Sequence, residues 1–116
     1  MITNSRMFVS NLANKFEMLR GILDEHLQDN FGEILPHILM ADYCRIVLSS
    51  ENDVLWVERF LSEIEDHFSD VVDDEVSNVI AVSFIEHLPP PDKHHQIVEK
   101  LGKKLKTQYS KTFGLQ

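Results

Sequence analysis

The sequence of 116 residues contains a single cysteine and no long apolar run. Cys44 has no second cysteine with which to form an internal disulfide bond, which fits a reducing compartment. No apolar stretch approaches the roughly 18–20 residues that span a membrane, and residues 1–12 lack the apolar core of a signal peptide. We therefore expect a cytoplasmic protein that makes no membrane contact.

Motifs that carry catalysis or bind cofactors are also missing. The chain has no nucleophile elbow, no glycine-rich phosphate loop and no zinc-ligand spacing. His94 and His95 are adjacent, so on a helix they would point about 100° apart. Glu63 and His67 could share one helical face, but nothing in the sequence specifies further ligands. We expect no enzyme activity, no cofactor and no metal.

One group of titratable residues is the best candidate for catalysis. It gathers acids, bases and an anion-binding side chain around one predicted turn: Glu25, His26, Asp29, Glu33, His37, Asp42 and Arg45. A simpler interpretation is that Asp42 and Arg45 form an ion pair along a helix and that His37 bonds to nearby backbone. The sequence leaves the role of this group open.

Apolar residues recur at spacings of three and four, which predicts helices. One helix is expected from Ser5, a possible N-cap, to Leu27, with a bend or break at Gly21. Others are expected from Pro36 to Val47 and over residues 54–68, with Leu35, Ile38, Leu39, Tyr43, Ile46 and Val47 as the buried stripe of the former. A lysine-rich helix is expected from Ile97, followed by a frayed tail at 110–116, and the sequence leaves open whether this helix is broken at Gly102.

The segment Asp73–Leu88 is predicted to be the central helix. Its apolar residues cover nearly the whole circumference, which is typical of a buried helix. A buried strand would give the same apolar run, but Asp73 or Asp74 can cap a helix and Pro89 can end it. The expected fold is a single-domain, compact, all-α bundle of five to seven helices over residues 1–116.

Charge is distributed unevenly along the chain. Residues 1–91 contain 17 acidic and five basic residues, whereas residues 92–116 contain six lysines and two acidic residues. An acidic body repels nucleic acid and attracts basic partners, although many proteins are acidic simply to stay soluble. The run KLGKKLK lacks arginine and interleaved aromatic residues, so it is a weak nucleic-acid motif. We expect a protein partner and no nucleic acid.

The predicted contact surface lies between the fourth helical segment and the central helix. The seven predicted contact carboxylates fall within 18 positions there, and a basic partner would relieve their mutual repulsion. Trp56 borders this surface and is either an interface residue or a cover for its own core. The predicted partner-binding residues are Trp56, Glu58, Glu65, Asp66, Asp70, Asp73, Asp74 and Glu75.

Three motifs carry a resemblance to a known group of proteins: EHLQDNFGEILPHILMADYCR, NVIAVSFIEHL and VEKLGKKLK. In these motifs the chain resembles a family of short, acidic, uncharacterised bacterial helical proteins. Such proteins are similar to the immunity proteins of contact-dependent growth inhibition and other polymorphic toxin systems. The resemblance implies a cytoplasmic protein that neutralises a toxin, and it implies no catalytic residue.

Charge and resemblance together favour a non-catalytic immunity protein. Its partner would be a cognate toxin, expected to be a basic nuclease domain whose active site or substrate groove it covers. A general regulatory or scaffold module is the alternative, and a small metal-binding protein or enzyme is the less favoured one. The choice between monomer and dimer stays open.

Overall fold

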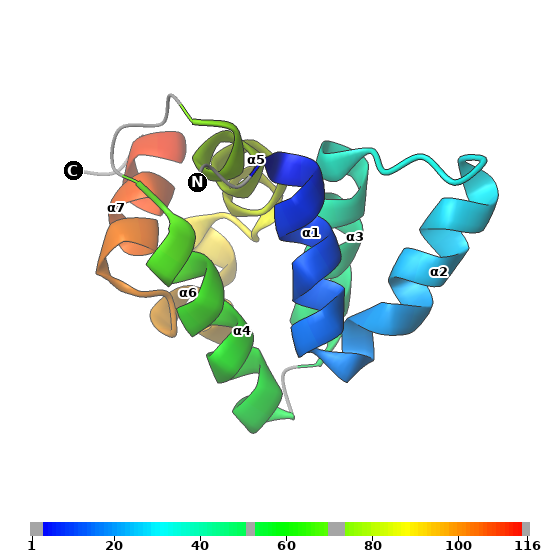
Figure 1. Ribbon diagram of the computed structural model, residues 1–116. Helices are drawn as coiled ribbons and strands as arrows, with labels where there is room; N and C mark the ends of the chain where they lie inside the picture. The colour runs from blue at the N-terminus through cyan, green and yellow to red at the C-terminus, as the bar shows by residue number, and fades with distance from the viewer. Residues whose placement is uncertain (1–3, 51–52, 70–73, 115–116) are drawn as a thin grey trace.

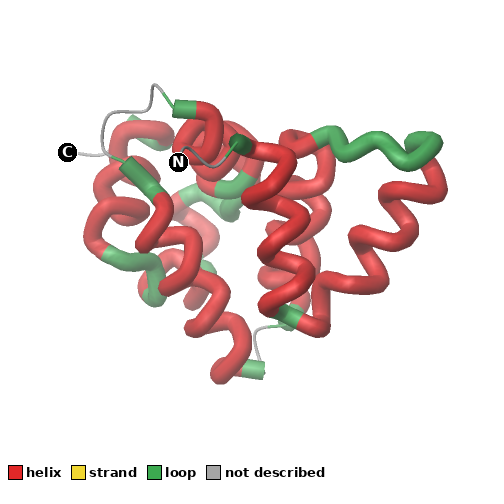
Figure 2. Tube along the Cα trace, in the orientation of Figure 1, coloured by secondary structure: helices red, strands yellow, loops and turns green. Residues whose placement is uncertain are grey.

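The computed structural model describes residues 4–50, 53–69 and 74–114, and in these ranges the regular secondary structure is entirely helical (Figures 1 and 2). The α-helices are α1 Ser5–Lys15, α2 Arg20–Asp29, α3 Pro36–Ser49, α4 Val54–His67, α5 Glu75–Ser83, α6 Gln96–Glu99 and α7 Lys103–Thr112. Short 3₁₀-helices lie at Glu17–Leu19 (η1), Ile85–His87 (η2) and Pro91–Lys93 (η3). The predicted all-α fold is confirmed.

The helices pack into one compact body with a radius of gyration of 13.6 Å, close to the roughly 13 Å expected of a folded chain of this length. Helix α5 lies between α1, α3 and α4, and its apolar residues are buried on nearly every side. Asp74 caps it, since its carboxylate accepts a hydrogen bond from the Ser77 N–H at 2.7 Å. The central segment is therefore a buried helix, as predicted. The α-helix ends at Ser83, earlier than the predicted Leu88, and the 3₁₀-helix η2 follows after Phe84.

The N-terminal segment breaks at Phe16, not at Gly21 as predicted. Phe16 is extended, with φ −122° and ψ 104°, whereas Gly21 lies inside α2. The break directs the Phe16 ring toward Phe60 and Trp56. The centroid of the Phe16 ring lies 5.6 Å from that of Phe60 and 6.4 Å from that of Trp56. Packing between distant segments therefore sets the position of this break.

The prediction that Ser5 caps the first helix is also wrong. Asn4 caps α1, because its side-chain oxygen accepts a hydrogen bond from the Met7 N–H. Ser5 is instead the first residue of α1 and is buried.

The chain breaks at Gly102 between α6 and α7, a point that the sequence left open, and the break has a steric cause. A Cβ atom at this position would lie 2.5 Å from Cδ of Glu65, so only glycine leaves room for that side chain. Helix α7 then continues to Thr112, with the rings of Tyr109 and Phe113 4.6 Å apart, so it extends into the predicted frayed tail. Residues 115–116 of that tail lie outside the described residues.

The buried face of α3 is rotated from the predicted one. Met40 and Cys44 are buried together with Leu39, Tyr43 and Val47, whereas Ile38 is 54% exposed and Ile46 is half-buried. The reason is that α3 buries the side that meets α1 and α5, which leaves Ile38 and Ile46 on the side toward α2. In Figure 1, α2 stands at the right-hand edge of the bundle, beyond α1 and α3. Within the described ranges no helix combines the length and apolar character that a membrane span requires.

Candidate functional site

Several carboxylates of the predicted acidic surface form hydrogen bonds within their own chain, and Glu65 is the first of them. Its carboxylate accepts hydrogen bonds from the N–H groups of Lys104 and Leu105, at 2.9 and 3.0 Å. These donors belong to the first turn of α7, where backbone N–H groups have no partner within the helix. Glu65 therefore acts as a long-range cap, and its charge faces the positive end of α7.

Glu75 performs a similar task at the start of α1. Its Oε1 atom accepts hydrogen bonds from the Ser5 N–H at 3.1 Å and from the Ser5 hydroxyl at 2.8 Å. The backbone bond, followed by the hydroxyl bond, lowers the pKa of Glu75. Together with the cap formed by Asp74, this means that three of the predicted contact carboxylates bind helix N-termini of their own chain.

The other predicted contact residues are less constrained. Glu58 lies 3.5 Å from the ammonium group of Lys100, and Asp66 is exposed and forms no ion pair within the described residues. Asp70 and Asp73 lie outside the described residues. Among the described members of the set, Glu58 and Asp66 are therefore the carboxylates that bind no helix N-terminus.

Trp56 mainly covers its own core. The indole is half-buried, with ring centroids 6.4 Å from Phe16 and 6.2 Å from Phe60. Its ring N–H is buried and has no hydrogen-bond partner among the described residues. Packing against Phe16 and Phe60 is enough to explain a large aromatic side chain at this position, and no contact with another protein is needed for it.

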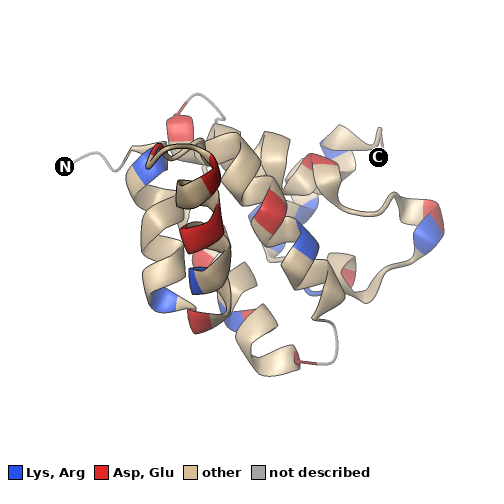
Figure 3. Cartoon of the chain, turned by 90° about the vertical axis from the view of Figure 1, so that its right-hand side faces the viewer, with Lys and Arg blue, Asp and Glu red and all other residues tan. Residues whose placement is uncertain are grey.

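A groove between α2 and α3 brings together most of the titratable group singled out in the sequence. It encloses about 580 Å³, and Figure 3 looks onto this side of the molecule, with acidic residues in red on the bordering helices. Its apolar lining comes from Ile22, Ile38 and Ile46, and its charged lining comes from Glu25, Asp29, Asp42 and Arg45. These side chains belong to two helices that are adjacent in sequence and joined by the turn at Asn30–Gly32.

The charges in this groove do not cancel. Asp42 and Arg45 form the ion pair that their spacing predicted. Glu25 and Asp29 lie one turn apart on α2, both are exposed, and neither forms an ion pair in the described part of the chain. The groove therefore has two free carboxylates beside an apolar lining.

His26 is a structural residue of this groove. It is buried, and its Nε2 atom accepts a hydrogen bond from the Leu35 N–H at 3.0 Å. The side-chain amide of Asn30 donates to the His26 carbonyl oxygen at 2.8 Å. These bonds fix the connection between α2 and α3, and they occupy the nitrogen that a general base would need.

Two members of the predicted group lie elsewhere. Glu33 is 3.9 Å from the guanidinium group of Arg6. His37 Nδ1 lies 2.7 Å from the Ser83 hydroxyl of α5, so it bonds to a distant side chain and not to nearby backbone. The arrangement leaves no acid–base pair directed at a common point in the groove.

Phe31 is an exposed aromatic residue that was not among the predicted contact residues. Its side chain is 100% exposed, and its backbone has φ +55°, a conformation that L-residues other than asparagine and aspartate rarely adopt. Gly32, the next residue of the turn, has φ +82°. The signal in the sequence was an aromatic residue inside an Asn-Phe-Gly turn, where the polar neighbours predict exposure.

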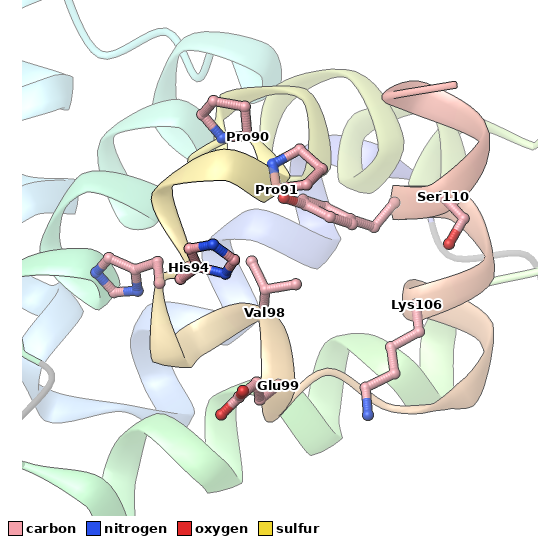
Figure 4. Close-up of a pocket in the computed structure, with 9 residues that line it drawn as sticks. Pro90, Pro91, His94, Val98, Glu99, Lys106 and Ser110 are labelled. Carbon is pink, nitrogen blue, oxygen red and sulfur yellow. The ribbon is translucent and has the colours of Figure 1, made fainter. Parts of the chain in front are cut away.

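A second cavity lies between η3, α6 and α7 and encloses about 360 Å³. Figure 4 shows Pro91, His94 and Val98 on one side of it and Lys106 and Ser110 of α7 on the other. Two further polar groups of its lining are already engaged: the Tyr109 hydroxyl donates to the Pro89 carbonyl at 2.6 Å, and His95 Nδ1 accepts from the Ile97 N–H. This cavity is a mainly apolar crevice.

The described residues form no candidate metal site, and Cys44 is buried. In the part of the chain that the structure describes, no three His, Cys, Asp or Glu residues are placed to hold one metal ion. Glu63 pairs with Lys15 and lies 3.5 Å from His67, as expected of a surface ion pair. Cys44 is buried, and burial raises its pKa to about 12, which leaves the thiol protonated and unreactive at neutral pH.

Comparison with known proteins gives a family without an assigned activity. Residues 9–115 match the family described as a domain of unknown function (DUF7674), which is nearly the whole chain. No curated protein and no solved structure matches the chain.

Proposed function

We propose that this chain, which belongs to the DUF7674 family of domains of unknown function, is a non-catalytic protein that binds a basic protein partner. The observation that carries the proposal is the pair of exposed carboxylates of Glu25 and Asp29 beside the apolar α2–α3 groove, neither of which forms an ion pair with another described residue. Carboxylates four residues apart on a helix repel each other, and cationic side chains of a partner would relieve that repulsion.

The charge of the whole chain supports the same proposal. Residues 1–91 have 12 more acidic than basic residues. A field of this sign accelerates the approach of a basic protein and disfavours nucleic acid. Glu58 and Asp66 on α4 would add to this long-range attraction, whereas Glu65, Asp74 and Glu75 would contribute less, since they bind helix N-termini of their own chain.

In its specific form, the proposal is a cytoplasmic immunity protein for a bacterial toxin. A toxin nuclease domain must hold phosphate groups, so its substrate groove is basic. An acidic helical protein with a rigid core could cover that groove and exclude the nucleic acid. The sequence motifs that resemble immunity proteins support this form, and they transfer no catalytic residue.

The proposal expects a neighbouring gene to encode a large secreted protein with a toxic C-terminal domain, and the test is co-expression of this chain with that domain. We expect the toxin domain alone to stop growth of the host, and this chain to restore growth and to co-purify with the domain. A general regulatory or scaffold module would leave the toxicity unchanged. Failure of the purified proteins to form a complex would contradict the immunity proposal.

A further inference from the structure

We infer that the α2–α3 groove docks an amphipathic helical segment of a protein partner, with an apolar strip flanked by lysine or arginine. This inference rests on the proposed function and specifies its contact face and the chemistry of the bound segment. It moves the contact from the α4–α5 surface, where the sequence placed it, to a groove whose carboxylates are still available.

The lining of the groove provides the apolar half of the contact. Ile38 lies on α3 and is 54% exposed, although its side chain is large and apolar. Ile22 of α2 and Ile46 of α3 are only half-buried beside it. Helix α2 packs against α1, η1 and α3 and leaves its outer side to solvent. A third helix laid into such a groove would bury these side chains, which is a recurrent mode of peptide recognition.

The rim provides the charged half. Glu25 and Asp29 project from α2 beside the isoleucines, and Asp42 lies on the opposite helix. Arg45 is held in its ion pair with Asp42, so it does not cancel the charge of α2. A segment with cationic residues on the sides of an apolar strip complements this arrangement, whereas an acidic or purely apolar segment does not.

The turn at the end of the groove provides an aromatic contact. Phe31 follows Asn30, which lines the groove, and its ring is fully exposed. The Gly32 N–H donates to the Leu27 carbonyl at 2.7 Å and the Glu33 N–H donates to the Asn30 carbonyl at 3.0 Å, so hydrogen bonds fix the turn. An exposed aromatic residue on a fixed backbone loses little conformational entropy on binding, and such residues are enriched among interface hot spots.

The first experiment uses a synthetic helical peptide of about five turns that has a leucine strip flanked by lysines. The control peptide has the same lysines but alanine in place of leucine. Titrated into ¹⁵N-labelled native protein, the leucine peptide should shift amide resonances of α2, α3 and the Asn30–Gly32 turn, with an affinity at least about tenfold above that of the control. Equal affinity of the two peptides, shifts centred on α4, or no binding would each contradict the groove.

The second experiment compares two variants with the same change in charge. Glu25→Lys with Asp29→Lys should weaken binding of the leucine peptide by about tenfold or more, whereas Glu58→Lys with Asp66→Lys should change it by about twofold or less. Ile38→Ser and Phe31→Ser keep the charge of the chain and should each weaken binding severalfold. Circular dichroism confirms that each variant is folded.

The same variants, applied to the toxin domain, separate this inference from the proposed function. If the native protein binds that domain and the Glu25→Lys, Asp29→Lys variant binds it equally well, the groove is not the contact face, while the proposed function stands. If the native protein binds the leucine peptide in the groove but not the toxin domain, the docking site stands and the immunity function is wrong.

Discussion

Phe84 lies where α5 gives way to η2, with 0% of its surface exposed and its ring 5.7 Å from that of Phe60. Replacing it by alanine removes buried apolar surface and leaves a cavity, which together cost about 3–5 kcal/mol. Because domains of this size are stable by only about 5–15 kcal/mol, the variant should unfold at a much lower urea concentration.

Phe31 offers a matched control for that measurement. Phe31→Ala is the same change of side chain at a fully exposed position. The free energy of unfolding of this variant should therefore stay within about 0.5 kcal/mol of the native value. If the two variants lost equal stability, the core would not be organised around α5.

The buried thiol of Cys44 should make the free energy of unfolding depend on pH in the alkaline range. Burial raises the thiol pKa from an ordinary value of 9.0 to about 12, so only the unfolded state releases this proton as pH rises through 9. The unfolded state then binds fewer protons than the folded state, and stability falls by at most about 1.4 kcal/mol per pH unit between pH 9 and 12. Burial also raises the pKa of Tyr43, which adds a loss in the same direction.

The measurement is urea unfolding at pH 8 and pH 10 for the native protein and for Cys44→Ala. The variant has a small cavity and a lower stability at both values, but it should lose less stability between them than the native protein does. An identical loss in both proteins would show that the thiol is not protected from ionisation.

At the scale of helices, Glu65 and Gly102 act together at the start of α7. Glu65→Ala removes the acceptor of two backbone N–H groups, which should cost about 1–2 kcal/mol. Gly102→Ala should cost a similar amount, because its Cβ would displace the Glu65 carboxylate from α7.

A double-mutant cycle checks this coupling. Once Glu65 is alanine, the Gly102→Ala change has nothing left to displace, so it should be close to neutral. Additive losses in the cycle would mean that the carboxylate does not cap α7.

Helix positions were largely predictable from the sequence, because apolar spacing and local caps are properties of neighbouring residues. The cap by Asp74 and the start of α3 at Pro36 are of this kind. The break at Phe16 was not predictable, since it depends on packing against Trp56 and Phe60 in another part of the chain.

The candidate site was harder to predict for the same reason. The sequence showed a row of carboxylates, but it could not show that Glu65 reaches a helix 40 positions later or that Glu75 reaches one 70 positions earlier. It did group Glu25, Asp29, Asp42 and Arg45, because α2 and α3 are joined by a short turn. The exposure of Ile38 followed from the rotation of α3, which only packing reveals.

At the scale of the whole molecule, the central claim is that an acidic helical protein captures a basic protein through the α2–α3 groove. The most direct measurement is the rate of association with the proposed cognate toxin domain, followed by stopped flow at about 0.01 M and about 1 M salt. Electrostatic interactions extend over about 30 Å in the first solution and about 3 Å in the second.

We predict that native association falls by about tenfold or more between the two salt concentrations, because steering by the carboxylates is screened. The variant Glu25→Lys with Asp29→Lys should associate more slowly than the native protein at low salt, and its rate should depend less on salt. Equal rates for the two proteins at low salt would contradict the account.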